Sequence, residues 1–122
     1  MSETHISFEA GEVIFSEGDA GDSMYVVTEG LVEIQKHTSS GPLLLSKLGP
    51  GEFIGEMAVI DKTRRSATAV AAEPTTLLVY PAQEIEQLIA NHPSVGVRMI
   101  ELLAIRLRKT NEKLKREVER GA

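Results

Sequence analysis

The chain has 122 residues, of which 42% are hydrophobic and 25% charged, a balance typical of one globular domain that can bury its own core. It contains no cysteine, which excludes disulfides, thiolate zinc sites and a thiol nucleophile. No apolar run approaches the roughly 18 residues of a membrane span, and the first residues have no basic stretch followed by an apolar one. We therefore expect no membrane span, no secretory signal and a cytoplasmic location.

The charge is unevenly divided along the chain. Residues 1–97 carry 5 lysines and arginines against 14 carboxylates, whereas residues 98–122 carry 8 against 4. An acidic surface repels polyanions such as nucleic acids, and the basic end is typical of a solvated helix face. We therefore expect no nucleic acid partner for this chain alone.

The first two thirds of the chain consist of short β-rich runs separated by glycines. These runs are residues 12–15, 24–28, 31–37, 43–48, 67–72 and 76–80. Short strands at this spacing predict a sandwich or barrel. Glu29-Gly30 predicts a hairpin turn between the second and third runs, because glycine reaches positive φ without strain. Residues 38–42 predict another hairpin loop.

Three segments have helical character. Residues 55–60 predict about a turn and a half of helix, and apolar residues recur at helical spacing in residues 82–91. A break follows, in which Ser94 is a candidate N-cap. Residues 95–120 then predict one long helix of about 40 Å at 1.5 Å per residue, which is longer than a small barrel can cover.

The long helix carries a narrow apolar seam. Its later apolar positions are Leu103, Leu107, Leu114 and Val118. These steps of four and seven form a heptad pattern in which one seat, near Thr110 and Asn111, is polar. Such a seam predicts a partner helix, so we expect a homodimer through residues 98–120. The alternative is a tail that frays beyond the domain.

The stretch IGEMAVIDKTRRSATA, residues 54–69, combines groups that suit a nucleotide. Gly55 allows close approach of a ligand, and the start of the predicted short helix offers free N–H groups and a partial positive charge. Arg65 adds a charged donor that pairs well with phosphate, and Glu56 can accept a hydrogen bond from a sugar hydroxyl. The alternative from spacing alone is a structural ion pair between Glu56 and Arg65.

Two parts of this stretch resemble a known motif. IGEMAV at residues 54–59 and RSAT at residues 65–68 resemble the phosphate-binding cassette of cyclic-nucleotide-binding domains. Residues 12–30 are similar to the opening β-roll of that family. Residues 106–113 are similar to the long C-terminal helix of its catabolite activator-like members. The resemblance therefore covers nearly the whole chain.

The resemblance implies a mainly β fold with flanking helices in a single domain over residues 1–122. About eight short strands would form a β-roll, a double-stranded β-helix of jelly-roll type, over residues 6–80 together with the cassette helix. The C-terminal helices would span residues 82–120, and the long helix would dimerise.

The resemblance also implies a ligand, cAMP more than cGMP. The residues that would bind it are Gly55, Glu56, Met57, Ala58, Arg65, Ser66 and Ala67. In the family pattern Glu56 accepts a hydrogen bond from the ribose 2′-hydroxyl and Arg65 pairs with the cyclic phosphate. Backbone N–H groups of Ala58 and Ser66 also bind the phosphate, and members with serine at the position of Ser66 commonly take cAMP.

Base contacts are implied from two places. Leu45 and Ser46 match the strand that lines the base, and Arg106, Thr110 and Asn111 match the helix that covers the adenine. The polar position in the heptad would then contact the base instead of packing against a partner helix. This sequence departs from the pattern at Asn111, where related proteins have serine, and in the loop before Arg65, which lacks the usual glycine.

Nothing in the sequence indicates catalysis. None of His5, His37 and His92 has a second histidine at i+2 or i+4, so we expect no metal, and no G-x-S-x-G context surrounds a serine. No helix-turn-helix follows residue 120, so we expect no DNA binding by this chain. We predict a non-catalytic sensor that signals through its last helix to an effector protein. The alternatives are a β-roll that only dimerises, and a regulatory fragment of a larger transcription regulator, channel or enzyme.

Overall fold

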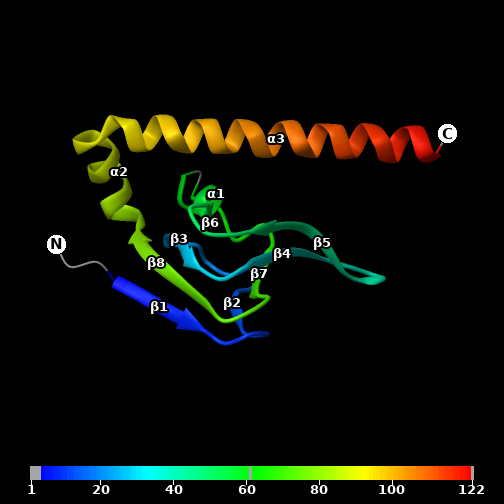
Figure 1. Ribbon diagram of the computed structural model, residues 1–122, viewed down its shortest axis with the longest axis horizontal. Helices are drawn as coiled ribbons and strands as arrows, with labels where there is room; N and C mark the ends of the chain where they lie inside the picture. Colours follow the sequence, from blue (N-terminus) through cyan, green and yellow to red (C-terminus); the bar gives the residue numbers. More distant parts are fainter. Residues whose placement is uncertain (1–3, 61, 122) are drawn as a thin grey trace. The chain divides into compact units, whose positions relative to one another are not determined.

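The computed structural model describes residues 4–60 and 62–121, and within these residues the chain forms eight strands and three helices (Figure 1). It divides into two compact units, Met1–Ile85 and Glu86–Ala122, so that all the strands belong to the first unit. In the described part of the chain, no helix is long and apolar enough to cross a membrane.

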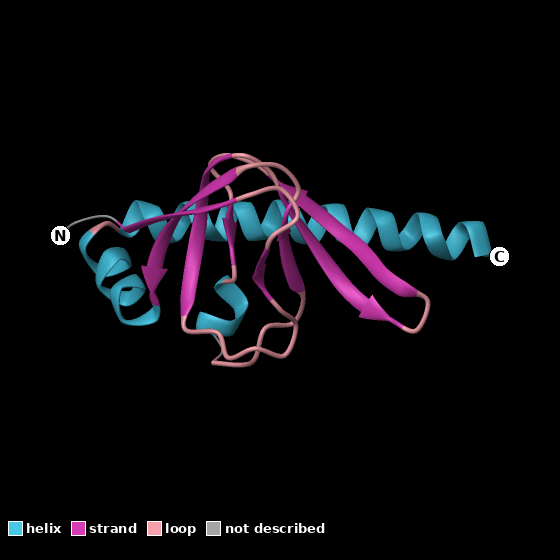
Figure 2. Cartoon of the chain, turned by 90° about the horizontal axis from the view of Figure 1, so that it is seen from below, coloured by secondary structure: helices cyan, strands magenta, loops and turns pink. Residues whose placement is uncertain are grey.

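The strands of the first unit form two antiparallel sheets, shown as magenta arrows in Figure 2. One sheet has the order β1 (Thr4–Phe8), β8 (Thr75–Pro81), β3 (Ser23–Glu29) and β6 (Phe53–Ile54). The other has the order β2 (Val13–Phe15), β7 (Thr68–Ala71), β4 (Val32–Thr38) and β5 (Gly41–Leu48). Apart from β4 and β5, which are neighbours in one sheet, successive strands lie in different sheets, and the two sheets confirm the predicted mainly β fold. Two strands, β1 and β6, were not among the predicted runs.

The prediction of a hairpin at Glu29-Gly30 is wrong. Strands β3 and β4 belong to different sheets, so the turn between them is a corner from one sheet to the other. Gly30 does have a positive φ of 99°, and an added Cβ there would collide with Thr75 Oγ1. Positive φ suits a hairpin and a corner equally, which explains the error. The second predicted hairpin is confirmed, because β4 and β5 pair directly and Thr38 lies opposite Gly41.

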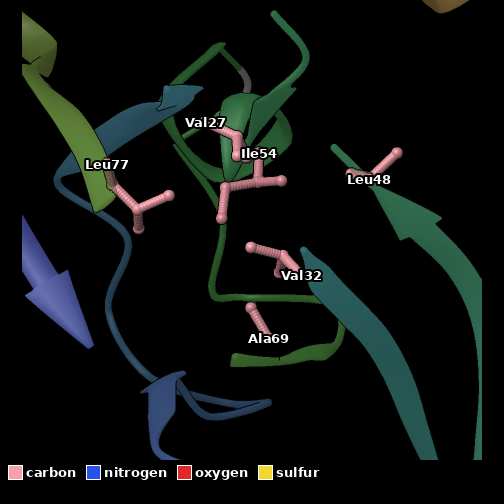
Figure 3. Close-up of a cluster of buried hydrophobic side chains, with 6 residues drawn as sticks. All are labelled: Val27, Val32, Leu48, Ile54, Ala69 and Leu77. Carbon is pink, nitrogen blue, oxygen red and sulfur yellow. The ribbon is translucent and has the colours of Figure 1, made fainter. Parts of the chain in front are cut away.

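The core lies between the two sheets and draws side chains from both (Figure 3). Its buried members are Val27, Val32, Leu48, Ile54, Ala69 and Leu77. Each large apolar side chain buried here contributes about 1.5–3 kcal/mol to the free energy of unfolding. On β7 the inward positions are alanines, Ala69 and Ala71, so the strand has an inward face that the sequence pattern did not reveal.

The second unit contains the end of α2 (Ala82–Asn91) and all of α3 (Pro93–Gly121). Helix α2 has the predicted bounds. Helix α3 begins earlier than predicted, and Ser94 is not its N-cap because Ser94 already lies in the first turn. Pro93 begins the helix, where its fixed φ fits and no intrahelical N–H bond is required. An added Cβ at Gly96 would lie 3.0 Å from Ile89 Cγ2, so the glycine allows α2 and α3 to pack closely.

Candidate functional site

The short helix α1 (Glu56–Ile60) follows directly after β6 and confirms the helix predicted at this point. Gly55 precedes it with a φ of 81°, a conformation that favours glycine. Glu56 and Ala58 are buried in the first turn, whereas Met57 points to solvent. Of the predicted cassette residues on this helix, Glu56 and Ala58 therefore face inward.

Arg65 is the charged residue around which the site is built, and only 4% of it is exposed. Its Nη1 donates a hydrogen bond to the carbonyl of Gly55 at 2.8 Å, and its Nη2 donates to the carbonyl of Ser23 at 2.7 Å. Both terminal nitrogens therefore bond to backbone oxygens. The guanidinium joins the start of α1 to the start of β3.

Two aromatic rings complete the surroundings of the guanidinium. Its central carbon lies 4.3 Å from the ring centroid of Phe15 and 5.8 Å from that of Tyr25. Carbonyls and rings carry no formal negative charge. Among the described residues, Nε of Arg65 is buried without a hydrogen-bond partner. Because an uncompensated buried charge is costly, an anion beside Nε would supply both the missing acceptor and the missing charge.

The loop between β2 and β3 holds the backbone of Arg65 from the other side. Arg65 N donates to Asp19 O at 2.8 Å, and Gly18 N donates to Arg65 O at 2.9 Å. Gly21, in the same loop, leaves no space for a side chain, because an added Cβ would collide with Ala58 Cβ and lie 3.1 Å from Arg65 Nε. Glycine at this position therefore lets the loop, the short helix and the arginine come together.

A polar network outside the core holds the residues after Arg65. Lys36 Nζ donates to Ser66 O at 2.7 Å and lies 3.2 Å from a carboxylate oxygen of Glu17. Glu17 in turn accepts a hydrogen bond from the backbone N–H of His37 and donates its own N–H to Thr68 Oγ1. The His37 N–H and then the Lys36 side chain lower the pKa of Glu17 below its ordinary value of 4.5.

The side chains next to Arg65 differ in exposure. Ser66 is exposed to solvent, whereas Ala67 is buried. The hydrogen bond from Lys36 Nζ to the carbonyl of Ser66 restrains the residue that carries the predicted phosphate-binding N–H. The cassette residues at both ends of the motif are thus brought together in the structure by Arg65 and its partners.

The predicted base-contacting residues fall in both units. In the first unit, Ile34 pairs with Ser46 and Gln35 pairs with Leu44, so Leu45 is the extra residue of a β-bulge on β5. Bulges re-aim side chains and are common beside binding sites. In the second unit, Arg106, Thr110 and Asn111 lie on α3. Their joint contact with a base stays a prediction.

Sequence reasoning did not single out four residues of the site, Phe15, Gly21, Tyr25 and Lys36. No local signal distinguishes these residues, because their roles arise from contacts between distant segments. Within residues 4–60 and 62–121, no three histidine, aspartate or glutamate side chains gather in a way that could hold a metal ion.

The first unit thus buries Arg65 among backbone carbonyls and aromatic rings, beside a short helix that a glycine precedes. The sequence matches the cyclic nucleotide-binding domain family over residues 5–92. The chain belongs to this family, as the cassette motif predicted.

Relatives and solved structures agree with this assignment. The chain is 39% identical over 108 residues to the cyclic AMP receptor protein of Thermus thermophilus, covering 88% of this chain and 50% of that protein. A solved cyclic nucleotide-binding domain from Methylobacillus flagellatus superposes with a TM-score of 0.85 at 31% identity, covering 94% of this chain and 67% of that one.

An enzyme also contains a similar domain. The cAMP-bound form of the EAL enzyme Bd1971 superposes with a TM-score of 0.69 at 33% identity, covering 95% of this chain and 32% of that chain, and a cGMP-bound form of the same enzyme matches as well. The chain spans about half the length of the curated regulators it matches, 50% and 49% in two cases.

Proposed function

We propose that this chain reversibly binds a 3′,5′-cyclic nucleotide, cAMP in preference to cGMP, and acts as a non-catalytic sensor. The observation that carries the proposal is the buried guanidinium of Arg65, which bonds to carbonyls and lies against rings and whose Nε has no acceptor within residues 4–60 and 62–121. A cyclic phosphate carries a single negative charge and oxygen acceptors, which suit a guanidinium held in this way. Charge-assisted bonds of this kind contribute about 1.5–3 kcal/mol each.

The remaining cassette residues have roles that follow from the family pattern. Arg65 pairs with the phosphate, and the backbone N–H groups of Ala58 and Ser66 donate to its oxygens. Glu56 accepts a hydrogen bond from the ribose 2′-hydroxyl beside Gly55. This role is supported by the burial of Glu56, which is only 7% exposed, at the start of α1. Met57 and Ala67 complete the backbone of the site.

The preference for cAMP rests on the serine at position 66 and on the similarity to the cyclic AMP receptor protein of Thermus thermophilus. The enzyme Bd1971 has been solved with cAMP and with cGMP, so selectivity depends on individual contacts. We assign the base to Leu45, at its bulge on β5, and to Ser46. On α3 we assign it to Arg106, Thr110 and Asn111.

We further propose that the signal passes through α3. Its seam residues Leu107, Leu114 and Val118 are 62%, 62% and 65% exposed in the single chain. A second copy that covers residues 98–120 would bury them, giving a homodimer. A ligand can shift the pairing of α3 only by its differential affinity for the two arrangements. The effector would be a separate or attached protein in the cytoplasm.

Titration calorimetry of the chain with cAMP, cGMP and 5′-AMP tests the proposal. We expect tighter binding of cAMP than of cGMP and weak binding of 5′-AMP, whose doubly charged, open phosphate does not match the ring geometry. If neither cyclic nucleotide binds, the chain is a β-roll that only dimerises, and the proposal fails.

A further inference from the structure

We propose that Phe15 is a positioning residue for the anion site, and that its ring, together with that of Tyr25, holds the Arg65 guanidinium in place for the ligand. The inference rests on the proposed function, because it assigns a role in nucleotide binding. We call the pair of rings the aromatic platform.

The guanidinium lies close to both rings of the platform, and the two rings lie close to each other. The central carbon of the guanidinium lies 4.3 Å from the Phe15 centroid and 5.8 Å from the Tyr25 centroid, and the two ring centroids are 6.2 Å apart with planes inclined by 24°. A cation within about 6 Å of a ring centroid is attracted by the negative face of the ring. The guanidinium therefore contacts both rings, and Phe15 makes the closer contact.

A β-bulge on β2 turns Phe15 inward. On β2, Val13 pairs with Val70 and Phe15 pairs with Ala69, so Ile14 is the extra residue of a bulge. Successive side chains of a regular strand point to opposite faces, yet Ile14 and Phe15 are both half-buried and both pack against the core. The bulge thus brings Phe15 under Arg65 without losing Ile14 from the core.

The second ring comes from the opposite sheet. Tyr25 lies on β3, where it pairs with Ile54 on one side and Val79 on the other. Ile54 immediately precedes Gly55, whose carbonyl accepts the hydrogen bond from Arg65 Nη1. The platform therefore links both sheets to the start of α1, and it fixes the guanidinium relative to the backbone of the cassette.

Neutral partners suit this task better than a carboxylate would. The carbonyls of Gly55 and Ser23 hold the edge of the guanidinium and the rings hold its face. None of these groups cancels the positive charge, so the charge stays available to an anion. Holding a binding group in its bound orientation raises affinity because less freedom is lost on binding.

Substitution at Phe15 tests the inference by calorimetry with cAMP. Phe15→Leu keeps an apolar side chain and removes the ring, and we expect the dissociation constant to rise about three- to tenfold, the range of a cation–π contact. Phe15→Tyr restores the ring, and its affinity should stay within about twofold of wild type. Ile14→Val changes the same bulge and should lower the unfolding midpoint without changing affinity.

A double-mutant cycle separates positioning of Arg65 from a general effect on the fold. In an Arg65→Gln background, no cation faces the ring, so Phe15→Leu should change the remaining affinity by less than about twofold. Should Phe15→Leu unfold at the assay temperature, Tyr25→Leu gives the same comparison with a smaller expected loss.

Unchanged affinity of Phe15→Leu would overturn the inference while wild-type binding upheld the proposed function. Tighter binding would overturn it too, because the ring would then be holding the arginine away from the ligand. Equal effects of Phe15→Leu in both backgrounds would show that the ring does not act through Arg65. If wild type binds neither cAMP nor cGMP, the proposed function fails first and the inference with it.

Discussion

Arg65 Nη1 donates a hydrogen bond to the carbonyl of Gly55, 2.8 Å away, and so joins the two ends of the phosphate-binding cassette through its own side chain. The two residues are ten positions apart, with α1 between them. Because the same guanidinium also bonds Ser23 and stacks on Phe15, the cassette is anchored to both sheets before any ligand is considered.

Gly21→Ala tests the close packing around Arg65. The added Cβ would collide with Ala58 Cβ and press on Arg65 Nε, so we expect a loss of about 1–3 kcal/mol in the free energy of unfolding, as for other overpacked sites. Affinity for cAMP should fall as well, because the arginine must move. Denaturant unfolding and calorimetry measure both effects.

Gly49→Ala is the matched control for this substitution. Nothing lies within 4 Å of a Cβ added at Gly49. This variant should retain wild-type stability to within about 0.5 kcal/mol, together with wild-type affinity. Equal behaviour of the two variants would mean that Gly21 is an ordinary loop glycine.

Glu56→Gln tests the proposed contact with the ribose. A hydrogen bond to a charged group contributes about 1.5–3 kcal/mol, so wild type should bind 2′-deoxy-cAMP at least about tenfold more weakly than cAMP. In Glu56→Gln this difference should shrink, since the carboxylate is gone. A constant ratio of the two dissociation constants in both proteins would remove Glu56 from the ribose site.

Lys36→Met tests the network that holds Ser66. The folded-state pKa of Glu17 lies below its ordinary value of 4.5, so its contribution to stability is present above the unfolded pKa and is lost as the pH falls through the folded pKa. Lys36 is one cause of the lowering. Lys36→Met should therefore make the loss of stability below the unfolded pKa of Glu17 shallower.

The unfolding midpoint, followed from pH 6 to pH 3, measures this dependence. Glu17→Gln should flatten the same part of the profile, because the titrating group itself is removed. Identical profiles for wild type and both variants would show that the network has no energetic role.

Leu114→Gln tests the proposed pairing of α3. Leu114 is an exposed seam residue, and a polar side chain in a heptad core weakens association. We expect a rise in the dimer dissociation constant in sedimentation equilibrium, whereas Lys113→Gln, one residue away, should leave it nearly unchanged. A monomeric wild type, or equal effects of the two changes, would contradict pairing through this seam.

The cassette was predictable because its chemistry is local. A glycine before a short helix and an arginine after a loop stand close in the sequence, and IGEMAV and RSAT carry a specific resemblance. The helix at residues 82–91 was equally predictable, since its periodicity is clear and proline bounds it on both sides.

The missed features depend on long-range packing. Strand β1 pairs with β8, about seventy residues later in the chain, and β6 is only two residues long. Arginine is almost never fully buried unless it is paired, so the burial of Arg65 among carbonyls and rings could not be expected from its type. The hairpin predicted at Gly30 was wrong for a related reason. A positive φ indicates a turn but does not determine which sheet the next strand joins.

Thermal unfolding of wild type and Arg65→Met, with and without cAMP and cGMP, tests the central claim most directly. Methionine fills buried space without charge, and each protein is compared with itself. A ligand at about 100 times its dissociation constant adds about 2.7 kcal/mol, which raises the midpoint of a domain this size by several degrees. The account predicts this rise in wild type, larger with cAMP, and its disappearance in Arg65→Met. No rise with either nucleotide, or an equal rise in both proteins, would contradict it.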